Sequence, residues 1–268
     1  MNLSLESMSC GYHGTPVLSR VSFTVEEGEV LCILGPNGVG KTTLFKSMLG
    51  LLKPLSGRVL VDGDDISSWS PRRRARYIGY IPQSHTPPFP YSVLQVVIMG
   101  RISRLGRFSS PGPEKYDRGR DVLASLGIEH LAERIYTEIS GGERQMVLIA
   151  RALAQDPRIL LMDEPTANLD YGNQARVLWQ INRLARQGMI VVMTTHSPDH
   201  AFLCPSRVVL IERESGITFG AADEIVTREN LERTYGIGVR ILSGIEDDTV
   251  IKSCVPLIDT ADQLTRRR

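Results

Sequence analysis

Three glycines in the run Gly35-Pro36-Asn37-Gly38-Val39-Gly40-Lys41-Thr42 join an apolar strand to a helix. The run follows the apolar segment Val30–Leu34 and matches the spacing G-x-x-x-x-G-K-[ST]. Helical patterning begins at Lys41 and continues to about residue 52, ahead of Pro54. A strand, a tight glycine turn and a helix N-terminus in this order predict a loop that binds phosphate groups.

The residue types in this loop suit a nucleoside triphosphate with Mg²⁺. Glycine lets the backbone turn tightly, so that successive N–H groups face the phosphates. Lys41 is placed to reach the β- and γ-phosphates, and Thr42 to give its hydroxyl to Mg²⁺. We therefore expect nucleotide contacts from Gly35, Pro36, Asn37, Gly38, Val39, Gly40, Lys41, Thr42 and Thr43. The pattern alone fits kinases, GTPases, helicases and recombinases equally, and a glycine turn without a ligand is the structural alternative.

A second strand, Ile159–Met162, runs directly into two carboxylates, Asp163 and Glu164. In open α/β sheets ligands bind at the carboxyl ends of the strands, where these two side chains are expected. We expect Asp163 to hold Mg²⁺ through water, and Glu164 to polarise the attacking water as a general base. The alternative is an acidic strand end that only faces solvent, and the phosphate loop upstream favours the functional interpretation.

Strands and helices alternate along much of the chain, which predicts an α/β fold with a mainly parallel sheet. Further strands are expected at residues 21–25, 58–61, 77–81, 189–194 and Arg207–Glu212, and helices at residues 171–187 and 222–235. Residues 84–90 predict a proline-rich loop, and residues 106–117 a break within an otherwise helical stretch. We expect an ATPase core at 1–83 and 156–235, a helical insertion at 84–155 and a C-terminal extension at 236–268.

The composition contributes mainly exclusions. The 268 residues carry a net charge of +1, so no overall field draws the chain to nucleic acid. The basic cluster at residues 72–76 lacks interleaved aromatics and predicts a solvated helix face. Cys32 and Cys204 have apolar neighbours and are expected to be buried, and no cysteine pair has metal-ligand spacing. With neither a signal peptide nor a run of about 18 apolar residues, we expect a cytosolic chain, and any membrane process would need a partner.

The segment Ile139-Ser140-Gly141-Gly142-Glu143 precedes a helical run and narrows the function. Ser140 and Glu143 have the S-x-x-E spacing of a capping box. Gly141 and Gly142 leave the helix N-terminus open to close approach by a phosphate, whereas the alternative is only a well-capped helix. The segment resembles the signature of the ABC ATPases, whose usual form is LSGGQ. Ile139 and Glu143 depart from that form mildly, since they keep the apolar anchor and the capping chemistry.

Other residues then resemble family elements in the family's order, over about residues 3–235. Tyr12 resembles the aromatic residue that stacks on adenine, and Gln83 the Q-loop glutamine that contacts Mg²⁺ and the attacking water. Asp170 resembles the acid of the D-loop, and His196 the switch histidine that contacts the γ-phosphate. An ordinary loop tyrosine and an unremarkable strand-end histidine are the alternatives. The resemblance implies a P-loop NTPase (RecA-like) core with an N-terminal antiparallel β portion and an inserted helical subdomain.

The resemblance also implies partners. In the family, ATP lies between the phosphate loop of one subunit and the signature of the other, so Ser140 of a second copy would cap the γ-phosphate at Lys41. ATP binding closes such a dimer and hydrolysis releases it. We therefore expect a homodimer at the cytoplasmic side of the membrane, bound to permease subunits and served indirectly by a substrate-binding protein.

The stretch after Gln83 indicates the class of transporter. Its segments Tyr91-Ser92-Val93 and Val97-Ile98-Met99-Gly100-Arg101 are similar to importer ATPases for iron–siderophore, haem, cobalamin and related metal chelates or oxyanions. Any apolar helix with a basic end is the alternative for this likeness.

Two further functions remain as alternatives, an ABC ATPase of another transporter or exporter and a soluble ABC ATPase that acts on nucleic acid or ribosomes. Only about a hundred residues separate Gly35 from Ser140, without heptads or cysteine ligand pairs, and the chain carries a single cassette. These features disfavour the soluble class. Glu164 and His196 together disfavour a binding module without hydrolysis.

Overall fold

The computed structural model describes residues 1–83, 89–101, 113–204, 207–212 and 216–258. Its centre is a six-stranded sheet in the order β10-β9-β3-β8-β7-β6. These strands are β3 (Val30–Leu34), β6 (Ile78–Ile81), β7 (Ile159–Met162), β8 (Ile190–Thr195), β9 (Arg207–Glu212) and β10 (Gly216–Ala221). All pair in parallel except β10, which lies antiparallel to β9 at the edge. The predicted α/β class with a mainly parallel sheet is confirmed.

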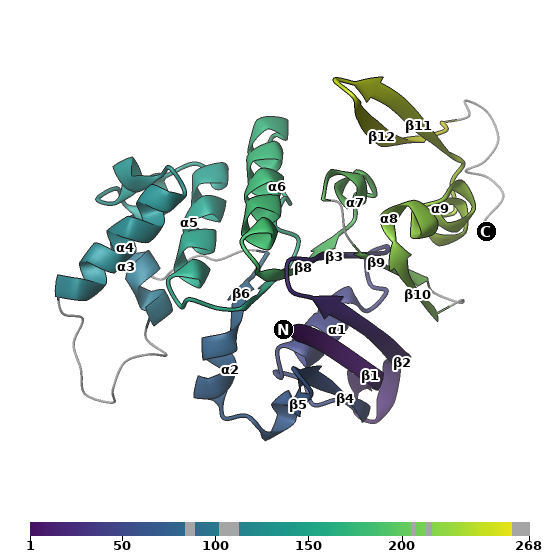
Figure 1. Ribbon diagram of the computed structural model, residues 1–268, viewed down its shortest axis with the longest axis horizontal. Coiled ribbons are helices and arrows are strands. Elements are labelled where there is room, and N and C mark those ends of the chain that lie inside the picture. The colour runs from purple at the N-terminus through teal and green to yellow at the C-terminus, as the bar shows by residue number, and fades with distance from the viewer. Residues whose placement is uncertain (84–88, 102–112, 205–206, 213–215, 259–268) are drawn as a thin grey trace.

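A second, antiparallel sheet lies beside the first in the N-terminal part of the chain (Figure 1). Its strands are β1 (Asn2–Tyr12), β2 (Thr15–Glu26), β4 (Ser56–Val61) and β5 (Asp64–Asp65). We did not predict β1, because a bulge interrupts the alternation of its buried residues. Leu3 and Leu5 are buried, the register shifts at Ser7, which has φ 45°, and burial resumes at Met8 and Cys10.

Strand β3 separates two hydrophobic cores, which explains its unbroken apolar sequence. Val30, Cys32 and Leu34 belong to one core, while Leu31 and Ile33 belong to the other. The first core includes buried residues of α5 (Gly141–Leu153) and α6 (Tyr171–Arg186). The second includes the antiparallel sheet and α1 (Lys41–Met48). The phosphate loop that follows β3 is therefore anchored between two packed layers.

The stretch expected to be helical contains three α-helices that lie together, at the left of Figure 1. They are α3 (Val93–Met99), α4 (Pro113–Ser125) and α5, with the short 3₁₀ turns Glu129–Leu131 and Tyr136–Glu138 between α4 and α5. The predicted break at 106–117 is wrong for residues 113–117, which open α4, because proline is tolerated in the first turn of a helix. Its residues 106–112 lie outside the described residues, as do 84–88 of the expected loop.

Two other helix predictions have wrong boundaries. Helix α1 ends at Met48 instead of about residue 52, since Gly50 turns left-handed (φ 65°) and Leu51 donates back to the Lys46 carbonyl. The helix expected at 222–235 is two helices, α8 (Ala222–Ile225) and α9 (Arg228–Tyr235). They are separated because Thr227 takes an extended backbone and caps α9.

Two smaller predictions, the exposed basic face at residues 72–76 and the burial of two cysteines, are confirmed. Helix α2 (Pro71–Tyr77) has no buried residue, as expected for a solvated basic face, and its last residue takes the place of the predicted start of β6. Cys32 and Cys204 are both buried free thiols. No helix in the described part of the chain has the length and apolar character needed to span a membrane.

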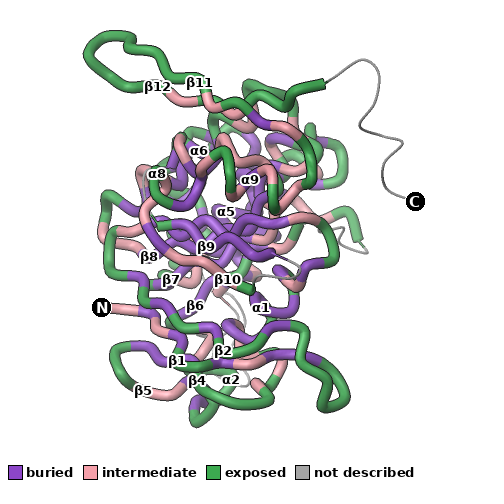
Figure 2. The backbone as a smooth tube through the Cα atoms, turned by 90° about the vertical axis from the view of Figure 1, so that its right-hand side faces the viewer, coloured by how far each residue is buried: buried purple, intermediate pink, exposed green. Residues whose placement is uncertain are grey.

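The C-terminal residues form a hairpin that we did not predict, β11 (Val239–Glu246) and β12 (Thr249–Pro256). It projects from the body, and most of it is exposed in Figure 2. Asp247 and Asp248 make its two-residue turn with positive φ. The base of the hairpin is attached near α7 (Asp199–Leu203), because the Cys254 N–H donates to the Asp199 carboxylate over 2.7 Å.

The packing of α3 against α5 gives a stability test. A Cβ added at Gly100, directly after α3, would collide with the backbone carbonyl of Arg151 in α5. Gly100→Ala should therefore lower the free energy of unfolding by about 1–3 kcal/mol, the usual cost of overpacking. Gly244→Ala in the exposed hairpin, where a Cβ meets open space, is the matched control. Urea denaturation measures both, and equal stabilities of the two variants would contradict this packing.

Candidate functional site

The phosphate loop is shaped by two close approaches of the backbone. Gly35 has φ 155°, and a Cβ there would lie 2.8 Å from the Ile211 carbonyl oxygen. Gly40, with φ 112°, precedes α1 and would place a Cβ 2.9 Å from Val17. These positions need glycine, because a side chain meets both strain and a steric clash. The loop thus opens directly onto the N-terminus of α1, where free N–H groups favour anions.

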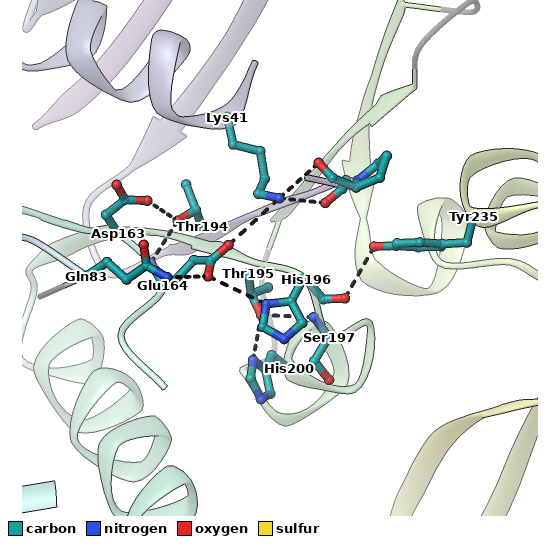
Figure 3. A network of polar contacts seen from close by, with 12 residues as sticks. Lys41, Gln83, Asp163, Glu164, Thr194, Thr195, His196, Ser197, His200 and Tyr235 are labelled. Atoms are coloured by element: carbon teal, nitrogen blue, oxygen red, sulfur yellow. Dashed lines mark hydrogen bonds and ion pairs between the residues drawn. The ribbon is translucent and has the colours of Figure 1, made fainter. Parts of the chain in front are cut away.

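Lys41 points from the start of α1 back beneath the loop (Figure 3). Its Nζ donates to the carbonyl oxygens of Gly35 (2.7 Å) and Pro36 (3.2 Å), and lies 3.9 Å from Glu164 Oε1. Burial lowers the pKa of the Lys41 ammonium, against the opposing effect of the Glu164 and Asp163 carboxylates. A buried cation with acceptors on one side is well placed to exchange them for phosphate oxygens.

The two carboxylates stand at the end of β7, next to the last residues of β8. The Thr194 hydroxyl donates to Asp163 Oδ1 over 2.7 Å, and it accepts the backbone N–H of Glu164 over 2.8 Å. Glu164 has a left-handed backbone with φ 45°, a conformation that costs energy in a non-glycine residue. The turn directs its side chain toward Lys41.

Gln83 and His196 reach the same carboxylate from two other strand ends. Gln83, after β6, donates its side-chain amide to Glu164 Oε2 over 3.0 Å. His196, after β8, places Nδ1 3.7 Å from that oxygen. The His196 side chain is 60% exposed while Glu164 is 15% exposed, so the imidazole stands between the carboxylate and solvent. Gln83 and His196 therefore both lie beside the carboxylate of Glu164, the third residue expected to act in catalysis.

An open pocket of about 460 Å³ lies beside Lys41, Gln83 and Glu164, while His196 is not among its walls. Its walls are Val17, Asn37, Gly38, Gly40, Lys41, Thr42, Thr43, Gln83 and Glu164. Of the other expected loop residues, Gly35 and Pro36 hold Lys41 from below, and Val39 packs into the core. The pocket has a cation and helix N–H groups for phosphates, and a carboxylate at its inner wall.

The residues expected to hold Mg²⁺ suit that ion. Thr42 and Gln83 line the pocket, and Asp163 adjoins Glu164. A hydroxyl, an amide and one carboxylate are hard oxygen donors, which Mg²⁺ binds together with phosphates and water. Across the described residues, no group of three or more His, Cys, Asp or Glu side chains forms a ready-made metal cage.

Three other expected contacts, Tyr12, the signature segment and Asp170, are not among the walls of this pocket. Tyr12 is exposed at the end of β1. Ser140 caps α5, and the predicted capping box is present: the Ser140 N–H donates to Glu143 over 2.8 Å, and the Glu143 N–H to Ser140 Oγ over 3.3 Å. Hydrogen bonding of the Glu143 carboxylate, first to the Ser140 side chain and then to the Ser140 backbone N–H, lowers the pKa of the Glu143 carboxyl.

The signature segment instead touches the start of α6 in the same chain. Asp170 caps α6 and accepts bonds from both the backbone and the side-chain amide of Asn173, which lower the pKa of the Asp170 carboxyl. A Cβ added at Gly142 would collide with that Asn173 amide. Gly142 therefore keeps two expected ATP-contacting elements side by side.

Sequence reasoning missed the threonines that precede the histidine. Besides Thr194, Thr195 pairs its hydroxyl with the buried His200 imidazole over 2.7 Å and accepts the Ser197 N–H. The Tyr235 hydroxyl donates to the His196 carbonyl over 3.4 Å. The two hydroxyls at the end of an otherwise apolar strand were the available signal, since buried hydroxyls need partners.

A family model described as ABC transporter matches residues 18–167 of the chain. The chain belongs to the ABC transporter family. It is an ATP-binding subunit, and such subunits are ATPases coupled to transport. An uncharacterised ABC transporter ATP-binding protein of Haemophilus influenzae is 40% identical over 90% of this chain and 92% of its own length.

Two other comparisons cover nearly the whole chain. The molybdate import ATP-binding protein MolC of the same organism is 34% identical over 96% of this chain and 97% of its own length. The structure of a metal-chelate type ABC transporter in an inward-facing conformation matches with a TM-score of 0.86 and 34% identity, over 96% of this chain and 98% of that one. The predicted resemblance to metal-chelate importer ATPases is thereby confirmed.

The contact between Gly142 and Asn173 gives a second test, in which the neighbouring glycine is the control. Gly141→Ala places its Cβ no closer than 3.9 Å to Leu169, so it should be neutral or raise stability by up to about 1 kcal/mol. Gly142→Ala should be less stable than Gly141→Ala, because it displaces Asn173 from Asp170. Thermal unfolding compares the two, and an equal or higher melting temperature for Gly142→Ala would contradict the contact.

Proposed function

We propose that this chain is half of a two-site ATPase that powers import of a metal chelate or a related oxyanion. The observation that carries the proposal is the convergence of Lys41, Gln83 and His196 on Glu164, while Ser140 of the same chain lies elsewhere. One chain thus supplies the residues around Glu164, while the signature segment that would cover the γ-phosphate has to come from elsewhere. Two copies related by a two-fold axis would complete two sites.

Within each site, the residues would divide the work as follows. Lys41 exchanges its carbonyl partners for the β- and γ-phosphates, and the loop N–H groups bind the remaining oxygens. Glu164 takes a proton from the attacking water, which Gln83 and His196 orient from either side. Thr42, Gln83 and Asp163 would hold Mg²⁺, which when bound neutralises charge on the phosphates.

The second copy would contribute the open N-terminus of α5. Ser140, Gly141 and Gly142 present N–H groups without bulky side chains, which suits the γ-phosphate of ATP held by the partner copy. Asp170 would lie at the same interface, and Tyr12 would stack on adenine. ATP would then bind the closed dimer more tightly than the open one, and hydrolysis would release it.

The transport class rests on the relatives. Those between 34% and 35% identical are named for import of molybdate, hemin and cobalamin, and one is named for a manganese transport system. We infer a peripheral subunit on the cytoplasmic side of the membrane, attached to permease subunits. A substrate-binding protein would deliver the substrate to the permease. We infer no role in nucleic-acid binding. The parts we propose are a core at 1–83 and 156–235, a helical part at 84–155 and an extension at 236–268.

The general-base role is tested with Glu164→Gln, which keeps the size of the side chain. Turnover should fall by about 10²–10⁴-fold, while ATP binding persists and ATP-trapped dimers accumulate. ATPase assays and size-exclusion chromatography with ATP measure these effects. Glu133→Gln, the same change at an exposed carboxylate paired with Arg120, is the control. Turnover near wild type in Glu164→Gln would refute the assignment.

Attachment to a permease is tested at the start of the helical part. Phe89 is 59% exposed and packs edge-on against Tyr91 beside α3. Phe89→Ala should lose the stimulation of ATPase by reconstituted permease while keeping the basal rate. Trp179→Ala, at an aromatic that is 60% exposed on α6, should keep both. Equal stimulation of the two variants would place the permease elsewhere.

A further inference from the structure

Thr194 lies between the two strands that carry the phosphate loop and the carboxylates. Strand β8 is the immediate neighbour of both β3 and β7 in the sheet. Met193 pairs with Met162, so the next residue of β8, Thr194, stands beside Asp163, while it also pairs with Ile33 of β3. Thr194 is fully buried, although its side chain carries a hydroxyl.

The hydroxyl links the two carboxylate residues to each other. It donates its single proton to Asp163 Oδ1, and its oxygen accepts the N–H of Glu164. Donor and acceptor capacities are thereby both used, and the direction of each bond is determined. The next residue differs, because the Thr195 hydroxyl turns to His200 and Ser197 (Figure 3).

The Glu164 N–H bond matters because of the backbone that carries it. A left-handed backbone in a non-glycine residue persists only where the surroundings hold it. At Glu164 the structure shows two such restraints, the N–H bond to Thr194 and the bond from the Ala167 N–H to its carbonyl. This conformation directs the side chain to Lys41, Gln83 and His196.

We propose that Thr194 is a positioning residue for ATP hydrolysis. Its hydroxyl orients the Asp163 carboxylate by engaging Oδ1, and it holds Glu164 in the turn that faces the pocket. Thr194 is fully buried and is not among the pocket walls, so it acts through these two residues. The inference rests on the roles of Asp163 and Glu164 proposed above.

Two pairs of variants separate the hydroxyl from the volume of the side chain. Thr and Val differ at this site by the hydroxyl alone, with a methyl in its place, and Ser and Ala differ by the hydroxyl in a smaller side chain. We expect Thr194→Val to lower kcat and to raise the Mg²⁺ concentration needed for the half-maximal rate. The two effects together should amount to about 10–100-fold, the usual effect of removing a bond that orients a metal-binding carboxylate. Thr194→Ser should keep most of the activity, and Thr194→Ala should lose it.

The readouts are kcat, the Mg²⁺ concentration at half-maximal rate, and the affinity for ATP in the full-length chain. We expect a lower kcat and a higher Mg²⁺ concentration at half-maximal rate, with an unchanged affinity for ATP. A packing role predicts the opposite order, with Val better than Ser, and this result would overturn the inference. So would equal kcat within both pairs. Should Thr194→Val fail to fold, the Ser and Ala pair decides alone.

Glu164→Gln in the same assay separates this inference from the proposed function. If Glu164→Gln keeps its turnover, the proposed general base is wrong, whatever Thr194 does. If Glu164→Gln loses turnover while the hydroxyl pairs behave alike, only the positioning role of Thr194 is wrong.

Discussion

The parallel pairing of β3, β8, β7 and β6 is the constraint on which the rest of the site depends. Parallel strands end at the same edge of a sheet, so the segments that follow them must meet there. The phosphate loop follows β3, His196 follows β8, the two carboxylates follow β7, and Gln83 follows β6. Residues up to 155 positions apart in the sequence, from Lys41 to His196, are therefore brought within contact distance of Glu164.

The same arrangement keeps the signature segment apart from the residues that meet at Glu164. The helical part lies in the sequence between β6 and β7 of the sheet. Its signature helix is in contact with the α6 cap through Gly142 and Asn173, and not with the chain's own pocket. This separation supports the proposal that another copy supplies the cap for the γ-phosphate. Two later residues bind next to the strand end that carries His196. The hydroxyl of Tyr235, the last residue of α9, donates to the His196 carbonyl, and the N–H of Cys254 in β12 donates to the Asp199 carboxylate.

Sequence patterns predicted the parts of this protein whose chemistry is local. The phosphate loop, the acidic end of β7 and the capping box at Ser140 each depend on a few adjacent residues, and the structure places them as expected. The bulge in β1 could not be predicted, because Ser7 shifts the register through pairing with distant strands. The β11–β12 hairpin has little burial and thus no apolar alternation to detect. The bonds of Thr194 could not be predicted, because they are made to Asp163 and Glu164 at the end of the neighbouring strand β7.

In the proposed dimer, Lys41 of one copy and Ser140 of another bind the same ATP. The most direct test is a cross-link between two differently tagged chains that carry Glu164→Gln and Cys254→Ser, one with Asn37→Cys and the other with Ser140→Cys. Disulfide formation between the chains measures the distance between the phosphate loop and the partner's signature. The account predicts a cross-link that forms with ATP and Mg²⁺ and is largely absent without nucleotide. The absence of a cross-link, or the same yield without ATP, would contradict it.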